Sequence, residues 1–70
     1  MANMTPNVKA RRRQELIDRD GSYCYMCGKH LRFQEVTLDH VVAKKDGGGN
    51  QINNLKVACY TCNHRRHNNI

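Results

Sequence analysis

The first apolar residues of the chain are sparse, and they lie in a segment that carries the signals of a helix. Thr5 is a preferred N-cap residue, and the proline after it suits the first helical position. Val8, Leu16 and Ile17 are the side chains of this segment that can contact a small core. We therefore predict a helix over residues 6–19, with the Asp-Gly pair that follows marking its end.

Basic side chains surround this predicted helix over more than half of its circumference. They are Lys9, Arg11, Arg12 and Arg13. Such a distribution is expected of a helix that lies on a surface or along a phosphate backbone. A plain solvated helix is equally consistent with the pattern.

A change to β-branched and aromatic residues after position 30 indicates strands. The segment 31–42, LRFQEVTLDHVV, fits short strands, with a break in its alternation at the Gln-Glu pair that suggests a turn or a bulge. The segment 43–54, AKKDGGGNQINN, lacks an apolar period and is predicted to be a long loop. A second short strand is expected over 55–59, LKVAC, and a terminal helix over 60–69, YTCNHRRHNN.

Four cysteines compensate for a core that the length of the chain keeps small. A chain of 70 residues with one Phe and no Trp makes a single domain that needs a further crosslink. Cys24-x-x-Cys27 and Cys59-x-x-Cys62 offer four thiolates in two pairs, which is the pattern of a structural Zn²⁺ site. Such an ion would close a loop of about thirty residues and supply folding free energy.

Other interpretations of the cysteines are disfavoured by their chemistry. A redox motif would need one Cys-x-x-Cys pair and an α/β scaffold that this chain is too short to contain. Disulfides are disfavoured in a reducing cytosol, where thiols stay reduced. His30, three residues past Cys27, could replace one cysteine, but four thiolates already complete a tetrahedron. Gly28 can take the left-handed backbone that the turn after Cys27 requires.

The charge of the chain indicates a polyanionic partner. Twelve Lys and Arg against six Asp and Glu give a formal charge of +6 with His neutral, and four zinc-bound thiolates would lower it to about +4. A basic surface that serves only solubility is the alternative. The sequence has no apolar run for a signal segment or a membrane span, so we expect a cytoplasmic protein with no membrane partner.

Several short motifs, present together and in order, carry a family resemblance. After the first cysteine pair they are Leu38-Asp39-His40-Val41, Gly47-Gly48-Gly49-Asn50, Asn54-Leu55 and Cys59-x-x-Cys62-Asn63. This combination resembles the HNH endonucleases of the ββα-metal fold, in the branch with two Cys-x-x-Cys zinc knuckles. The resemblance implies a small zinc-stabilised α+β domain. We expect a basic N-terminal helix over residues 1–22 and an HNH nuclease core with the Cys₄ site over residues 23–70, together forming one domain.

The resemblance also implies a general base and a residue that orients it. In such nucleases an Asp and a His end a strand, and an Asn comes from the following loop. His40 is the predicted base, since imidazole titrates near the working pH. Asn54, directly before a leucine, is predicted to accept the second ring N–H of His40, while Asn50 and Asn53 compete for this role and are otherwise turn formers. The run Gly47–Gly49 either lets the loop bring Asn54 back to His40 or is a flexible link.

A catalytic divalent ion is the last part of the implied site. Asp39 and Asn63 are predicted to supply oxygen ligands, with His67 as a third ligand in the manner of members that use His on this helix. Asn63 and His67 are four residues apart and share a helical face, whereas His64 is rotated by about 100°. Oxygen ligands favour Mg²⁺ or Mn²⁺, and an added imidazole admits Ni²⁺, Co²⁺ or Zn²⁺. Many members have His where this chain has Asn63, so the metal preference stays open.

The predicted function is metal-dependent hydrolysis of phosphodiester bonds in DNA, with double-stranded DNA as the expected partner. In the predicted loop and the terminal helix, the candidates for phosphate contacts are Lys44, Lys45, Arg65 and Arg66. One alternative is a noncatalytic zinc-ribbon module that binds nucleic acid by charge. Another is a zinc domain for protein interaction.

Overall fold

The computed structural model describes residues 5–68 of the chain, with the side chains of residues 5–66. Within these residues lie two helices and two strands, namely α1 (Pro6–Asp20), β1 (Thr37–His40), β2 (Leu55–Ala58) and α2 (Tyr60–Asn68). The connections contain 3₁₀ turns at Phe33–Glu35, Lys44–Asp46 and Ile52–Asn54. This order of elements confirms the predicted small α+β class.

The helix α1 begins and ends where its sequence signals predicted. The Oγ1 atom of Thr5 accepts a hydrogen bond from the N–H of Val8 at 3.3 Å, and the proline after it lies in the first turn. At the other end, Gly21 donates its N–H to the carbonyl oxygen of Ile17 at 2.7 Å. Leu16 is fully buried, so one side of α1 faces the core while most of its basic side chains stay at the surface.

The strands are shorter than the sequence pattern indicated. The predicted break in alternation is a 3₁₀ turn over Phe33–Glu35, so that β1 starts only at Thr37. Leu31 is buried without belonging to a strand, because the chain before the turn forms only an isolated bridge between Tyr23 and His30. Apolar burial in this segment therefore reflects packing in the core cluster and not a longer sheet.

The pairing of β1 with β2 assigns neighbouring site residues to opposite faces of the sheet. The strands are antiparallel, with Leu38 opposite Val57 and His40 opposite Leu55. Residues opposite one another in such a pair share a face, and successive residues alternate. His40 therefore lies on the face of Leu55 and Val57, whereas Asp39 lies on the other face.

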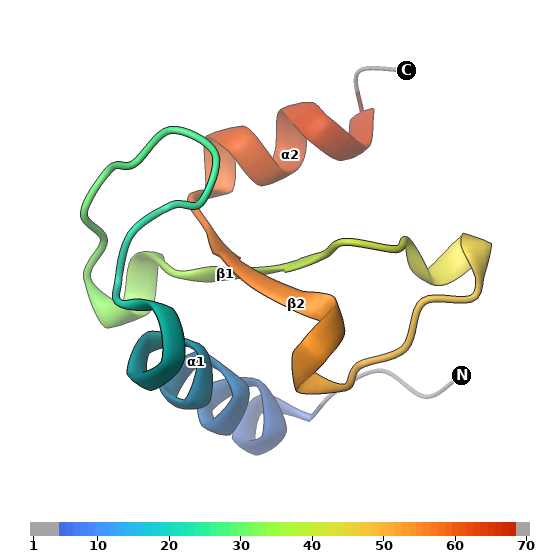
Figure 1. Cartoon of the computed structure of the whole chain (residues 1–70), viewed down its shortest axis with the longest axis horizontal. Helices are drawn as coiled ribbons and strands as arrows, with labels where there is room; N and C mark the ends of the chain where they lie inside the picture. Colours follow the sequence, from blue (N-terminus) through green and yellow to red (C-terminus); the bar gives the residue numbers. More distant parts are fainter. Residues whose placement is uncertain (1–4, 69–70) are drawn as a thin grey trace.

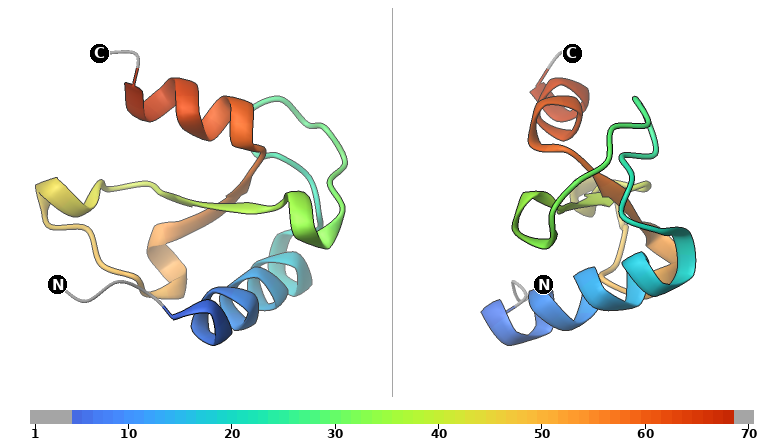
Figure 2. Two further views of the ribbon diagram at one scale, coloured as in Figure 1. Left: turned by 180° about the vertical axis from the view of Figure 1, so that it is seen from behind. Right: turned by 90° about the vertical axis from the view of Figure 1, so that its left-hand side faces the viewer.

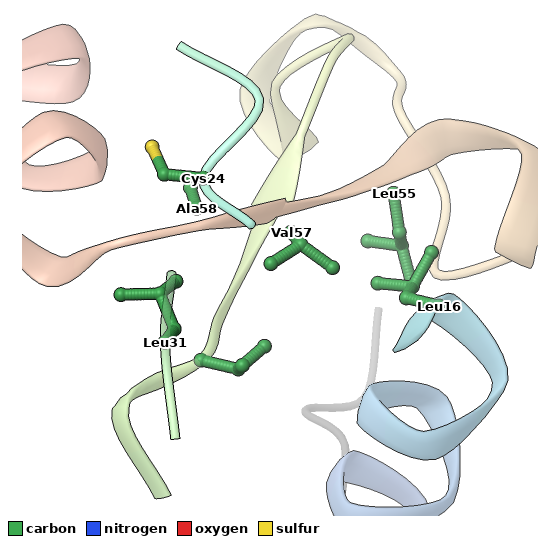
Figure 3. Close-up of a cluster of buried hydrophobic side chains, with 7 residues drawn as sticks. Leu16, Cys24, Leu31, Leu55, Val57 and Ala58 are labelled. Carbon is green, nitrogen blue, oxygen red and sulfur yellow. The ribbon is translucent and has the colours of Figure 1, made fainter. Parts of the chain in front are cut away.

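The two strands lie between the two helices (Figure 1), and this arrangement is also clear in the views of Figure 2. On the α1 side, Leu16 packs in one cluster with Leu55 and Val57 (Figure 3). Cys24 and Ala58 belong to the same buried cluster, toward the first residues of α2. The core is thus a thin layer that runs from α1 to the cysteines.

The glycine run folds tightly against the start of its own loop. A Cβ atom on Gly48 would lie 1.7 Å from the carbonyl oxygen of Val42, so only glycine fits there without a backbone shift. The N–H of Gly48 donates to the carbonyl oxygen of Ala43 at 2.9 Å. This close packing favours the predicted reversal of the chain over a flexible link.

Candidate active site and metal centre

The four cysteines converge on one point. Their Sγ atoms all lie within 4.8 Å of one another, and a tetrahedral ion with Zn–S bonds of about 2.3 Å would hold sulfurs about 3.8 Å apart. The backbone arrangement is that of a metal knuckle: Gly28, with φ of +80°, donates its N–H to the carbonyl oxygen of Cys24 at 2.8 Å. These cysteines are positioned to hold a metal ion, as the spacing predicted.

The pKa values of two of the cysteines differ widely when no metal ion is present. Burial raises the pKa of Cys24, but backbone hydrogen bonds from Cys59, Cys27 and Met26 outweigh it and lower the pKa to about 6. The hydrogen bond with Cys59, together with burial and the other thiols, raises the pKa of Cys62 to about 12. A metal ion would supply the positive charge that lets all four sulfurs ionise.

His30 does not belong to this cluster. Its side chain is exposed, and its ring lies 5.1 Å from the ring of Tyr23, centroid to centroid. Among the described His, Cys, Asp and Glu residues, the grouped ligands are the four cysteines alone. The structure therefore agrees with the surface role predicted for His30.

The end of β1 presents His40 to a half-buried position beside the loop. Its Nε2 atom lies 2.7 Å from Oδ1 of Asn50. Since a carbonyl oxygen can only accept, Nε2 carries the proton and Nδ1 is left as an acceptor. The ring thus has the fixed orientation and tautomer that a general base requires.

The predicted contact between Asn54 and His40 is wrong, because Asn50 takes that place. Asn54 is buried, its Oδ1 accepts from the N–H of Val42 at 2.9 Å, and its Nδ2 donates to the carbonyl oxygens of Val42 and Gly49 at 3.1 and 2.9 Å. The side-chain amide of Asn54 therefore ties the loop to the residues after β1. Its polar atoms are engaged there, which leaves the ring of His40 to Asn50.

Asp39 lies on the opposite face of β1 and is fully buried. Nη1 of Arg66 donates to both of its carboxylate oxygens, at 2.7 and 2.8 Å, and the hydroxyl of Tyr25 donates to Oδ2. Burial and this hydrogen bond to the carboxylate raise the pKa of Tyr25 to about 12, so the phenol stays protonated. Sequence reasoning missed Tyr25, whose only signal was an aromatic residue between two ligand cysteines.

Arg66 is partly exposed, but its guanidinium is engaged at the end of β1 and not left for the phosphate contact that the sequence suggested. It donates to the backbone carbonyl oxygens of His40 and Val41, at 3.2 and 2.9 Å, in addition to its contacts with Asp39. Its guanidinium thus neutralises a buried charge and satisfies backbone oxygens at once.

Asn63 of α2 contacts β1 at Thr37, on the face of Asp39, and borders the same hollow as His40. Its Nδ2 atom donates to Oγ1 of Thr37 at 3.0 Å and to the carbonyl oxygen of Leu38 at 3.5 Å. Asn63 and His40 line one hollow of about 290 Å³, here called the basic hollow, whose lining is Lys9, Arg13, Val36, Thr37, Leu38, His40, Lys44 and Asn63. A second, shallower hollow also borders His40 and is lined with it by Ala43, Lys44 and Lys45.

The predicted ligands of a catalytic ion are only partly in place. Asp39 and Asn63 offer the oxygen atoms that a hard divalent cation prefers, but the guanidinium of Arg66 covers the carboxylate of Asp39. An ion at Asp39 would have to displace that guanidinium. The side chain of His67 lies outside the described residues. The ligand set of Asp39, Asn63 and His67 therefore stays a prediction.

Comparisons with known proteins assign the chain to a family. No helix among the described residues has the length and apolar character needed to cross a membrane. No curated protein matches the chain. A family model described as HNH endonuclease matches residues 24–69, well over half of the chain, and this segment includes both cysteine pairs, His40, Asn50 and Asn63. The chain therefore belongs to the HNH endonuclease family.

Proposed function

We propose that this protein is a metal-dependent endonuclease that hydrolyses phosphodiester bonds in double-stranded DNA. The membership in a nuclease family supports the reaction class. The observation that carries the proposal is His40, whose Nε2 is held by Asn50 at 2.7 Å beside a hollow lined by lysine and arginine side chains. A base with one nitrogen fixed and the other directed to water is what hydrolysis of a phosphodiester needs.

His40 is the proposed general base. Its Nδ1 atom takes a proton from water as the water attacks phosphorus, and the Nε2–H bond to Asn50 stabilises the imidazolium that forms. Asn54 acts indirectly, because it holds the loop that carries Asn50. In this scheme Asn50, a competitor in the sequence analysis, orients His40, and Asn54 holds the loop in place.

The proposed catalytic ion is Mg²⁺, Mn²⁺ or Ni²⁺, held by Asp39, Asn63 and His67. When bound, such an ion offsets the negative charge that develops on the departing 3′ oxygen, which would leave 5′-phosphate and 3′-hydroxyl ends. For Asp39 to act as a ligand, Arg66 must turn its guanidinium away from the carboxylate. Asn63 needs no such change, since its Nδ2 is the atom engaged with Thr37 and Leu38.

The ion in the cysteine site is proposed to be structural Zn²⁺. Four thiolates leave no open coordination position, and soft sulfur ligands select zinc over magnesium or calcium. A cytoplasmic location, where thiols stay reduced, is consistent with such a site and is part of the proposal.

Plasmid nicking tests the proposed function. The wild-type protein and His40→Ala are incubated with supercoiled plasmid and Mg²⁺, Mn²⁺ or Ni²⁺, with His30→Ala as a matched control for loss of an exposed imidazole. We expect nicking by the wild type and by His30→Ala, and a loss of about 10²-fold or more in His40→Ala. Equal nicking by the wild type and His40→Ala would refute the assignment of His40.

The second candidate is a noncatalytic zinc module that binds nucleic acid by charge. The same basic hollow favours it, since lysine and arginine side chains would bind phosphates without cleavage. Salt-dependent DNA binding with no cleavage in any of the three metals would select this candidate over the nuclease.

A further inference from the structure

We infer that Lys9 and Arg13 of α1 bind DNA phosphates in the basic hollow, next to the bond that His40 would cleave. This inference rests on the proposed function and extends it, because α1 lies outside the segment 24–69 that matches the nuclease family. Lys9 and Arg13 nevertheless line the same hollow as His40 and Asn63. The added helix thus completes the wall of the candidate active site.

The spacing of Lys9 and Arg13 places both on one face of α1. They are four residues apart, so their side chains project from successive turns in nearly the same direction. Arg11 lies about 160–200° away around the helix axis and is exposed on the far side. The basic residues of α1 are therefore not equivalent, since only some of them face the hollow.

Two contacts fix the position of the Arg13 side chain. Its Nε–H donates to the carbonyl oxygen of Val36 at 3.1 Å, and its guanidinium lies 5.7 Å from the ring centre of Phe33. The hydrogen bond uses Nε and the ring contact uses the face of the guanidinium, while no hydrogen bond joins the Nη atoms to another described residue. A planar fork with its two outer nitrogens available is suited to bind a phosphate at two oxygens.

The helix itself is fixed to the strands, so these cations have a defined position. Near its C-terminal end, Arg19 donates to the carbonyl oxygens of Ile52 and Leu55, at 3.0 and 2.9 Å. Near its middle, Arg13 ties α1 to Val36, directly before β1. Contacts at two separate places hold α1 against both strands, and a phosphate in the hollow would meet the cations without ordering a mobile segment first.

The arrangement of cations around His40 indicates how the backbone of DNA would pass. Lys9 and Arg13 lie in the basic hollow, Lys44 lines both this hollow and the shallower one, and Lys45 lines only the latter. A strand that follows both hollows past His40 would therefore meet several cations near the phosphate at the base. Such contacts hold the reacting bond in place, which contributes to catalysis by orientation.

DNA binding as a function of salt tests the inference. In a His40→Ala background, which prevents cleavage, the affinity for a short DNA duplex is measured by fluorescence anisotropy over a series of salt concentrations. The variants are Lys9→Gln, Arg13→Gln and Arg13→Lys, with Arg11→Gln as the control that removes the same charge from the far side of α1. Circular dichroism checks that each variant is folded.

Lys9→Gln and Arg13→Gln are each expected to weaken binding several-fold and to reduce the slope of log affinity against log salt by about 0.9. Arg13→Lys should keep the slope and lose affinity, because the charge remains and the fork does not. Arg11→Gln should change the slope by less than half as much. An equal effect of Arg11→Gln and Lys9→Gln would overturn the inference.

Failure of the proposed nuclease gives a different result from failure of this inference. A wild-type protein that cleaves nothing, while Lys9→Gln still reduces the salt slope more than Arg11→Gln, would refute the nuclease and support the phosphate site. A wild-type protein that cleaves plasmid, with no difference between Lys9→Gln and Arg11→Gln in binding, would support the nuclease and refute the phosphate site.

Discussion

Arg66 on α2 donates its Nη1 to both carboxylate oxygens of Asp39 on β1, at 2.7 and 2.8 Å. The side chain of Asp39 is completely buried, and that of Arg66 is 34% exposed. A buried carboxylate without a partner is costly, so this pair joins the last helix to the strand that carries His40. The pair also places the guanidinium of Arg66 at the carboxylate of Asp39, which the family resemblance predicts to be a ligand of a divalent ion.

Loss of this guanidinium is expected to destabilise the fold. Arg66→Gln leaves the carboxylate of Asp39 buried without its arginine, at a cost of roughly 2–3 kcal/mol, less than for a fully buried pair because Arg66 is partly in solvent. Urea unfolding of the metal-loaded protein measures this difference. Arg65→Gln removes the same charge from an exposed neighbour on α2, and an equal loss in both variants would show that the ion pair does not carry the effect.

The same variant tests whether Asp39 can hold a divalent ion. Removal of the guanidinium opens the carboxylate, so Mn²⁺ should raise the melting temperature of Arg66→Gln by more than that of the wild type. Addition of Asp39→Asn to Arg66→Gln should abolish the extra shift. If Mn²⁺ shifts the wild type and Arg66→Gln equally, Asp39 is not a ligand in this arrangement.

Removal of the metal from the cysteine site is expected to unfold the domain cooperatively. The core is a thin layer, and Cys24 is one of its buried members, so the ion and the core stabilise the same contacts. Circular dichroism during titration with a chelator should show one transition that Zn²⁺ reverses. An unchanged spectrum after verified metal removal would contradict a structural role for the ion.

A methyl group at Gly48 should disturb the loop that positions Asn50. The Cβ would meet the carbonyl oxygen of Val42 at 1.7 Å, and relief of this clash requires a backbone shift that costs about 1–3 kcal/mol. Gly49→Ala is the control, because the three atoms nearest to its Cβ would all belong to the flexible side chain of Gln51. We expect Gly48→Ala to reduce both stability and plasmid nicking, and comparable stability of the two variants would argue against the tight turn.

The role of Asn50 is separable from that of Asn54 by kinetics and stability. Asn50→Ala removes the acceptor for His40 Nε2–H, worth about 1 kcal/mol, and should slow nicking roughly 3- to 10-fold with little loss of stability. Asn54→Ala should lower stability by about 1–3 kcal/mol, since it leaves the backbone of Val42 without its partners. Asn53→Ala, an exposed neighbour, is the control, and a rate equal to that of Asn50→Ala would remove Asn50 from the mechanism.

Much of the framework could be predicted from local signals in the sequence. Thr5 and the proline after it announce α1, and the two Cys-x-x-Cys pairs bring distant segments to one ion because four thiolates have a single stable arrangement. The position of His40 at a strand end follows from the glycine-rich loop after it. These features depend on neighbours along the chain or on a ligand geometry that leaves few alternatives.

The partners of individual polar side chains could not be predicted in the same way. Asn50, Asn53 and Asn54 lie within five residues, and the direction of each amide depends on how the loop closes and not on residue type. Arg66 has the appearance of a surface cation on an exposed helix until α2 is placed over Asp39. For the same reason, helical spacing shows that Lys9 and Arg13 share a face, but only the docking of α1 directs that face to His40.

Successive side chains of β1 point to opposite faces, so the strand separates the proposed base His40 from the proposed metal ligand Asp39. In the proposed enzyme, His40 would take the proton from water on one face of β1, and Asp39 would hold the ion that neutralises the leaving oxygen on the other face. The reacting phosphate must then lie at the free edge of β1, where it can reach both faces. A slip of one residue in the pairing of β1 with β2 would exchange those faces, so the register of four residue pairs governs whether the two roles can meet at one phosphate.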